Sequence, residues 1–308
     1  MKKNILLLGG CGFIGLNLLE ALSAAGRYQV IVFDSPAACE KNARQLAPAK
    51  TYRGDFNASR DLETIFQEQP IDRVFHLISS TVPATSNQDV AADIETNLLG
   101  TIRLLDLLVK YRVPGLTYLS SGGTVYGAAA RIPVDEDAPT APLCSYGIVK
   151  LAVEKYLALY RRLHGLDYLI LRPSNPYGEW HSSRQQGLIN VALSKALAGE
   201  EIVVYGDGTV VRDYIYIKDL AGIMVNLLDQ GVGGQLLNLG SGQGHSVNEI
   251  LALVEKLHGR VKVRYAAARA ADVPAIVLNT DKLRAFYSPQ LTDLATGMAR
   301  TYEWLKRQ

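Results

Sequence analysis

The sequence predicts an α/β protein built on a doubly wound parallel sheet. Short apolar runs alternate with amphipathic segments along the first half of the chain. The first apolar run leads directly into a glycine-rich turn, and the second ends in an acidic residue. This pattern is typical of parallel strands joined by helices, with ligands at the carboxyl ends of the strands. The 308 residues suffice for one large domain with a smaller lobe.

Composition excludes several classes of partner. The formal net charge is +2 and acidic and basic residues are interspersed, so we expect neither nucleic acid nor a membrane as partner. The three cysteines are far apart and the five histidines are scattered, so we expect reduced thiols and no metal site. The uninterrupted apolar run at 5–8 is shorter than the roughly 7–15 residues of a signal peptide core. We therefore expect a cytoplasmic protein without a leader.

The first strand, expected at 4–8, is followed by glycines in the pattern G-x-x-G-x-x-G and then by a helical pattern. The first glycine allows a tight turn, the second allows close approach to a pyrophosphate, and the third allows the helix to pack on the strand. The helix N-terminus would present amide donors and a positive dipole end to the phosphates. The predicted phosphate-binding residues are Gly9, Gly12, Phe13, Ile14 and Gly15.

The next two predicted strands add acidic residues. The second strand, at 29–33, ends in Asp34, about 20 residues after the turn, where an acid binds the ribose hydroxyls. Because a carboxylate there would repel a 2′-phosphate, we predict NAD rather than NADP as cofactor. The third strand, at 51–55, ends in Asp55, which together with Phe56 would meet the adenine.

The alternation continues to the centre of the chain. A helix at 61–67 and a strand at 74–77 are followed by a long helix at 89–111, which carries Asn97, a further predicted cofactor contact. A fifth strand, at 116–121, ends in Ser120 and Ser121. Hydroxyls at that edge of the sheet would lie beside the nicotinamide.

The next helix opens with Tyr146, and Lys150 lies four residues later on the same helical face. A phenol ionises near pH ~10, and nearby cations, the Lys150 ammonium and a nicotinamide, favour the phenolate. A lowering of roughly three units requires about 4 kcal/mol. The same spacing recurs at Tyr214 and Tyr302, but these lie in a strand-like run and in the final helix. We therefore predict Tyr146 and Lys150 as the proton-transfer pair.

Several motifs occur in a fixed order. They are the glycine turn, Asp34, Asp55, E-T-N-L-L-G-T with Asn97, S-S-G-G-T-V-Y-G, Tyr146 with Lys150, L-R-P-S-N-P-Y-G, Y-G-D-G-T-V-V-R-D-Y-I-Y-I-K-D-L and R-A-A-D-V-P. With them the chain resembles the extended short-chain dehydrogenase/reductases, and among these the nucleotide-sugar epimerases of the UDP-glucose 4-epimerase type.

This resemblance implies a Rossmann-type sheet in residues 1–173, with return segments near 212–240, and a smaller C-terminal α/β substrate-binding lobe in residues 174–308. It also implies NAD, a UDP-sugar substrate and a homodimer paired through the helices at 94–111 and 146–164.

One position departs from the family pattern. Gly122 stands where the family usually has its active-site serine or threonine, so Ser121 and Thr124 are the candidate replacements. Family members that eliminate water or carbon dioxide usually carry a carboxylate here, whereas Gly122, Gly123 and Thr124 supply none. This favours epimerisation, with a 4-ketoreductase, decarboxylase or dehydratase, or a non-catalytic NAD-binding sensor, as alternatives.

The resemblance also assigns substrate contacts. Asn175 would lie near the hexose or its phosphate, Tyr205 near the nucleotide base, and Arg212 and Arg269 at the diphosphate, where guanidinium groups suit paired oxygens. Asp272 would orient Arg269 or reach the sugar. The alternatives are an Asn-Pro turn for Asn175 and surface ion pairs for the arginines.

The expected reaction is reversible inversion at C4 of a UDP-hexose. Tyr146, as phenolate, would take the proton of the 4-hydroxyl while hydride passes to NAD. The 4-keto sugar would then turn over and receive the hydride on its opposite face.

Overall fold

The computed structural model describes residues 2–183, 186–268 and 273–308. It contains a seven-stranded parallel sheet in the order β10-β6-β5-β4-β1-β2-β3. This confirms the predicted fold class. The strands are β1 (Lys3–Leu8), β2 (Tyr28–Asp34), β3 (Lys50–Arg53), β4 (Arg73–His76), β5 (Gly115–Leu119), β6 (Asp167–Pro173) and β10 (Gln235–Leu239).

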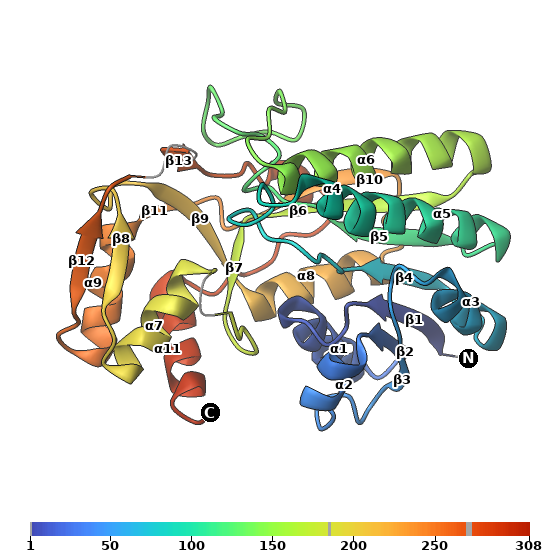
Figure 1. Cartoon of the computed structure of the whole chain (residues 1–308), viewed down its shortest axis with the longest axis horizontal. Coiled ribbons are helices and arrows are strands. Elements are labelled where there is room, and N and C mark those ends of the chain that lie inside the picture. Colours follow the sequence, from blue (N-terminus) through green and yellow to red (C-terminus); the bar gives the residue numbers. More distant parts are fainter. Residues whose placement is uncertain (1, 184–185, 269–272) are drawn as a thin grey trace.

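Helices cover both faces of this sheet, with α5 and α6 on one face and α1 and α8 on the other (Figure 1). The central strand β1 explains this arrangement, because Ile5, Leu6, Leu7 and Leu8 are all fully buried and side chains alternate between the two faces. The helices of the part of the fold built on this sheet are α1 (Phe13–Ala25), α2 (Pro36–Lys41), α3 (Ser59–Glu68), α4 (Val90–Asp93), α5 (Gly100–Lys110), α6 (Ser145–His164) and α8 (Ile217–Asp229).

The segment expected as one continuous helix at 89–111 is interrupted. Between α4 and α5 the backbone forms the π-helix η1 (Ile94–Leu99). Such wide turns are rare and are found mostly at functional sites. Here the widened turn contains Asn97, whose side-chain amide donates to Asp93 at 2.8 Å.

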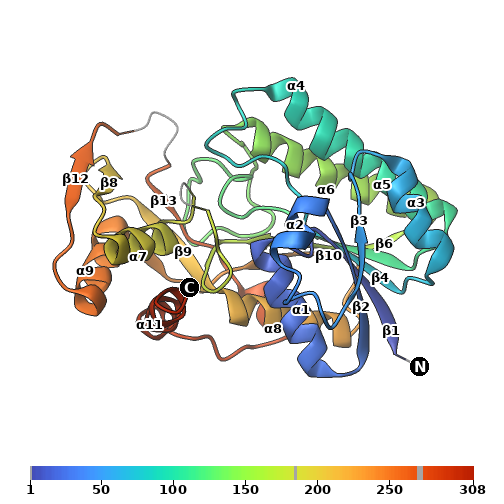
Figure 2. The same ribbon diagram turned by 60° about the horizontal axis from the view of Figure 1, so that its bottom comes forward.

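The second half builds smaller sheets. The strands β7 (Asn175–Tyr177), β11 (Gly244–Ser246) and β13 (Ala275–Ile276) all pair with β9 (Val211–Tyr216), while β8 (Ile202–Tyr205) pairs with β12 (Val263–Ala266). Figure 2 shows α7 (Leu188–Ala198), α9 (Val247–His258) and α11 (Leu294–Leu305) near the β8–β12 pair. A short α10 (Asp281–Arg284) contacts β10.

The segment after β9 returns to the large sheet. Helix α8 packs on α1, and β10 pairs with β6 in register from Gln235 opposite Leu169 to Leu239 opposite Pro173. The edge of the sheet near β6 thus lies where the two halves of the chain meet. Among the described residues no helix is both long and apolar enough to cross a membrane.

Candidate active site

The glycine turn after β1 is shaped by its backbone. Gly9 has a φ of +84°, which side chains rarely adopt. A Cβ on Gly15 would lie 2.6 Å from the Cα of Gly10, so α1 can pack this closely only with glycine there. Gly12 caps α1 and supplies no side-chain hydrogen bond to the first amides of the helix. These features fit a dinucleotide pyrophosphate.

Asp34 lies at the end of β2 beside this turn. Its carboxylate accepts hydrogen bonds from the backbone amides of Cys11, at 2.9 Å, and Ser35, at 2.8 Å. It therefore joins the turn to the second strand, at the position predicted for a ribose contact.

The other predicted adenine contacts lie after β3, which ends at Arg53. Asp55 is exposed and accepts from the amide of Asn57 at 2.9 Å. Phe56 is buried, with its ring centroid 5.1 Å from that of His76. Phe13 and Ile14, on the first turn of α1, are half-buried.

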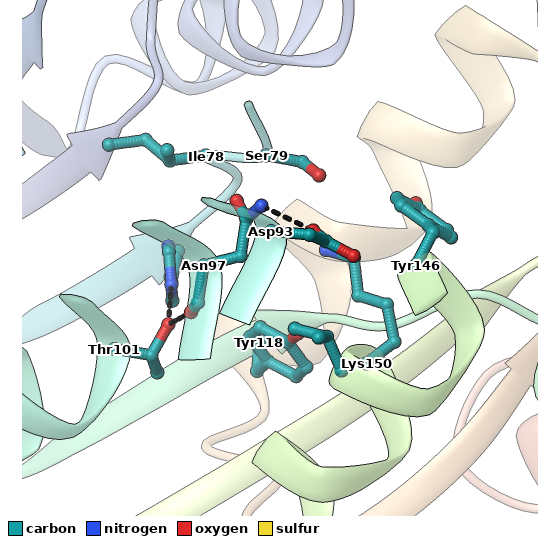
Figure 3. A pocket seen from close by; sticks show the side chains of 10 residues that line it. Ile78, Ser79, Asp93, Asn97, Thr101, Tyr118, Tyr146 and Lys150 are labelled. Atoms are coloured by element: carbon teal, nitrogen blue, oxygen red, sulfur yellow. Dashed lines mark hydrogen bonds between the residues drawn. The ribbon is translucent and has the colours of Figure 1, made fainter. Parts of the chain in front are cut away.

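Tyr146 and Lys150 face one pocket from the first turns of α6, and Asn97 and Asp93 face it from η1 and α4 (Figure 3). Lys150 is buried, and its Nζ donates to the backbone oxygen of Leu119 at 2.8 Å. The same Nζ lies 5.5 Å from the centroid of the Tyr146 ring. The structure thus brings the predicted pair together at the carboxyl end of β5.

The other two Tyr-x-x-x-Lys copies lie elsewhere. Tyr214 is on a strand while Lys218 is on α8, so the two do not share a helical face. Tyr302 is on α11, where its hydroxyl lies 3.0 Å from Nδ1 of His258. Neither copy lines the pocket of Tyr146.

The expected lowering of the Tyr146 pKa is wrong for the chain by itself. Burial raises the pKa of this phenol to about 12, and a hydrogen bond with Ser121 only partly opposes the rise. Burial also lowers the pKa of Lys150 to about 8, because a desolvated ammonium is unfavourable. The helical spacing suggested that each side chain would stabilise the charged form of the other. Burial disfavours both charged forms, and it is the largest influence on both pKa values.

The hydroxyls after β5 differ in their partners. Ser121 acts on Tyr146 by opposing the rise of its pKa, whereas the Oγ1 of Thr124 is buried with no partner among the described residues. The Oγ of Ser120 donates to Glu154 at 2.5 Å, so this hydroxyl belongs to the buried interior instead. Ser121 and Thr124 are thus the hydroxyls of this loop that remain for a ligand.

Gly122 is explained by a residue far along the chain. A Cβ at Gly122 would lie 2.6 Å from Cδ1 of Leu278 and 3.0 Å from the backbone oxygen of Arg172. Leu278 is buried and fills the space that a serine or threonine side chain would need. The glycine at position 122 and the leucine at position 278 therefore fit each other sterically.

Sequence reasoning missed the buried charges around the pair. Glu154, one turn after Lys150, forms an ion pair with Arg172 at 2.6 Å, and each side chain is 3% exposed. Asp93 is fully buried four residues before Asn97, and this helical spacing was the available signal. Across the described ranges no group of three or more metal-ligating side chains converges.

The predicted substrate contacts lie in the second half. The Nδ2 of Asn175 donates to the backbone oxygen of Asp213 at 2.8 Å, and Nη1 of Arg212 donates to the backbone oxygen of Val211 at 2.8 Å. The strands β7 and β9 that carry them are neighbours, while Tyr205, at the end of β8, belongs to the two-stranded sheet. Arg269 and Asp272 lie outside the described residues.

Comparison with known proteins places this geometry in a family. Residues 5–240 match the NAD dependent epimerase/dehydratase family. A UDP-glucose 4-epimerase of Halalkalibacterium halodurans is 31% identical over 324 residues, covering 98% of this chain and 95% of that protein.

Two solved structures superpose over 99% of both chains: UDP-glucose 4-epimerase of Thermotoga maritima with UDP-glucose, at TM-score 0.91 and 31% identity, and UDP-glucuronic acid 4-epimerase of Bacillus cereus with UDP-glucuronic acid and NAD, at 0.89 and 25%. With its glycine turn, Asp34 and the Tyr146–Lys150 pair on a seven-stranded parallel sheet, the chain belongs to the NAD-dependent epimerase/dehydratase family.

Proposed function

We propose that the protein is an NAD-dependent epimerase that inverts C4 of a UDP-hexose through a 4-keto intermediate. The observation that carries this proposal is the position of Tyr146, whose ring centroid lies 5.5 Å from Nζ of Lys150 in one pocket at the carboxyl edge of the sheet. Ligands of doubly wound sheets bind at this edge.

In the proposed mechanism Tyr146 takes the proton of the 4-hydroxyl and later returns it. NAD, when bound, supplies the acceptor and donor of the C4 hydride and a positive charge that lowers the pKa of the phenol. Ser121, whose side chain acts on the pKa of Tyr146, relays or orients the proton. Thr124, whose Oγ1 has no partner in the described structure, donates to or accepts from the sugar. Catalysis is then mainly positioning and pKa tuning.

The loop after β5 supports epimerisation over elimination. Gly122, Gly123 and Thr124 carry no carboxylate, so this loop supplies neither the acid nor the base that loss of water needs. A 4-ketoreductase remains the nearest alternative, and it would consume reduced cofactor in every turnover.

The cofactor and substrate residues follow from the same proposal. Residues 1–173, with return segments near 212–240, hold NAD through the glycine turn, Asp34, Asp55, Phe56 and Asn97. Residues 174–308 hold the UDP-sugar through Asn175, Tyr205 and Arg212, with Arg269 and Asp272 as further predicted contacts. The two related structures contain UDP-glucose and UDP-glucuronic acid, so UDP is the shared part and the sugar is to be identified by assay.

The test is incubation with a panel of UDP- and GDP-hexoses, with the products resolved by NMR. We expect C4 inversion of at least one UDP-hexose without added cofactor. Tyr146→Phe should bind NAD and substrate as the wild type does but lose turnover by a factor of about 10²–10⁴. Activity only with stoichiometric NADH would instead indicate a ketoreductase, and wild-type turnover in Tyr146→Phe would exclude this mechanism.

We also propose a homodimer formed through α6 and the helices at η1 and α5. Ile148, Leu159 and Leu163 are 55%, 43% and 62% exposed along α6, and Ile94 and Leu99 on η1 are 39% and 44% exposed. Apolar side chains repeated along a helix face favour burial against another copy. Light scattering at micromolar concentration should give the dimer mass, and Ile148→Glu should give the monomer.

Cytoplasmic localisation is the corresponding proposal for the compartment. Cys11, Cys39 and Cys144 are free thiols, although the Sγ atoms of Cys11 and Cys39 lie only 3.5 Å apart. Such thiols persist where the surroundings are reducing. Fractionation of the native host should place the protein in the cytoplasm.

A further inference from the structure

Asp93 is a buried carboxylate to which the proposed mechanism gives no role. It ends α4 and is fully buried. Its Oδ1 accepts from the hydroxyl of Thr81 at 2.7 Å and from Nδ2 of Asn97 at 2.8 Å, and its Oδ2 accepts from the hydroxyl of Ser145 at 2.6 Å. The carboxylate is thus held by three neutral donors from three different segments.

One of these donors, Ser145, links Asp93 directly to α6, the helix that carries Tyr146. Ser145 is the first residue of α6 and immediately precedes Tyr146. The amide of Ser145 is held as well, because it donates to Oδ1 of Asn87 at 2.8 Å. The segment before α4 and the end of α4 therefore both anchor the turn that carries the phenol. Figure 3 shows Asp93 in the same pocket as Asn97, Tyr146 and Lys150.

Asp93 and Glu154 are both buried carboxylates near Lys150, but they differ in their partners. Glu154 is neutralised by two hydrogen bonds from Arg172, at 2.6 and 2.9 Å. Asp93 takes part in none of the ion pairs found within the described ranges. A buried carboxylate without a paired cation exerts a strong field on nearby titratable groups, since the surroundings screen it weakly.

The titratable and charged groups around Lys150 come from several elements. They are Asp93 on α4, His76 on β4, Tyr118 on β5, and Tyr146 and Glu154 on α6. Burial lowers the pKa of Lys150 to about 8, and the charges of Asp93 and Glu154 oppose that lowering. Asp93 also adds to the effect of burial in raising the pKa of Tyr146.

We propose that Asp93 is a positioning residue of the proton-transfer site: it anchors the first turn of α6 through Ser145 and provides the negative charge that keeps Lys150 an ammonium. This inference rests on the proposed function for its kinetic consequences, although its electrostatic part concerns the protein alone. Lys150 in turn keeps its bond to the backbone oxygen of Leu119 and its ammonium, 5.5 Å from the centroid of the Tyr146 ring.

The central test is Asp93→Asn, which keeps the size of the side chain and removes its charge. Loss of the charge should lower the pKa of Lys150 and that of Tyr146 together. We expect the Lys150 titration midpoint, followed by NMR of ¹⁵N-lysine-labelled protein and assigned with Lys150→Met, to fall by about one pH unit or more. Both limbs of the pH profile of kcat should move to lower pH by a similar amount.

Two variants separate charge from anchoring. Ser145→Ala keeps the charge, so the Lys150 midpoint should stay within about 0.3 units while kcat falls about 3- to 10-fold. Asp89→Asn makes the same chemical change at the exposed N-cap of α4, where asparagine caps equally well, and should change neither quantity.

The outcomes are distinguishable. A Lys150 midpoint in Asp93→Asn within 0.3 units of the wild type would overturn the electrostatic role, and wild-type kcat in Ser145→Ala would overturn the anchoring role. Should Asp93→Asn fail to fold, Asp93→Glu keeps the charge, and a fall of a full unit in its Lys150 midpoint would equally overturn the inference. If no UDP-hexose is epimerised, the proposed function fails, while the NMR titration still tests Asp93.

Discussion

The two sides of Lys150 are both acidic and both buried, but they are built differently. Toward β6, Glu154 is paired with Arg172, whose guanidinium also lies 4.8 Å from the centroid of the Tyr126 ring. Toward α4, Asp93 accepts from hydroxyl and amide donors and forms no ion pair within the part of the chain that the structure describes. A charge that is already paired acts mainly on packing and stability, whereas an unpaired one acts on its titratable neighbours. The β6 side is therefore expected to control folding, and the α4 side to control protonation.

The largest effect is expected for Arg172→Met, which tests whether the β6 side of Lys150 controls folding. The change leaves Glu154 buried without its cation, which should lower the free energy of unfolding by about 3–5 kcal/mol. Denaturation in urea measures this loss. The double variant Arg172→Met with Glu154→Leu should recover most of the stability, because it removes both charges. A loss below about 1 kcal/mol in the single variant would contradict the assignment.

Lys150→Met tests, through the pH dependence of stability, whether Lys150 is held as a desolvated ammonium. The folded-state pKa of Lys150, about 8, is lower than its ordinary value of 10.5. Between these values the unfolded chain binds the extra proton, so this group makes the protein more stable as pH rises. The unfolding free energy of the wild type relative to Lys150→Met should grow by about 2–3 kcal/mol from pH 7.5 to 10. Urea denaturation at each pH measures this difference in unfolding free energy. A difference that does not change with pH would contradict the desolvation of the Lys150 ammonium.

A smaller effect is expected for Gly122→Ser, in the loop after β5. Gly122→Ser places a side chain against Leu278 and the backbone oxygen of Arg172, and overpacking of this kind should cost about 1–3 kcal/mol. In a Leu278→Ala background the same change should cost less than about 1 kcal/mol. Thermal unfolding of the four proteins of this cycle measures the coupling, and additive losses would refute the proposed compensation.

The smallest effect is predicted for an exposed ion pair. Lys218 on α8 donates to Glu20 on α1 at 2.7 Å, with side chains 32% and 60% exposed. Water screens such a pair, so Lys218→Met should change stability by less than about 1 kcal/mol, and still less at high salt. A loss comparable to that of Arg172→Met would show that burial is not what distinguishes the two pairs.

Much of the fold could be predicted because its signals are contiguous. Alternating apolar runs specified the parallel sheet, and the glycine turn, Asp34 and Tyr146 with Lys150 each lie within a few residues of their structural context. The spacing of Tyr146 and Lys150 fixed their common helical face. It did not fix how far each side chain is buried, and burial determined the direction of the pKa of Tyr146.

The features that could not be predicted join residues distant in the chain. Asp93 meets Ser145, and Gly122 meets Leu278, only because the tertiary fold brings them together. The π-helical turn within 94–99 was also unexpected, because hydrophobic periodicity does not distinguish one widened turn from a regular helix. The assignment of individual substrate contacts and the boundary between the two domains remain predictions.

The contact between Gly122 and Leu278 has a consequence for biosynthesis. All seven strands of the large sheet have been translated once β10 leaves the ribosome, whereas Leu278 emerges later. Domains generally fold in the order in which they are made. A nascent chain is therefore expected to form the parallel sheet and its glycine turn before the loop around Gly122 takes its final shape, so that cofactor capture precedes catalytic competence.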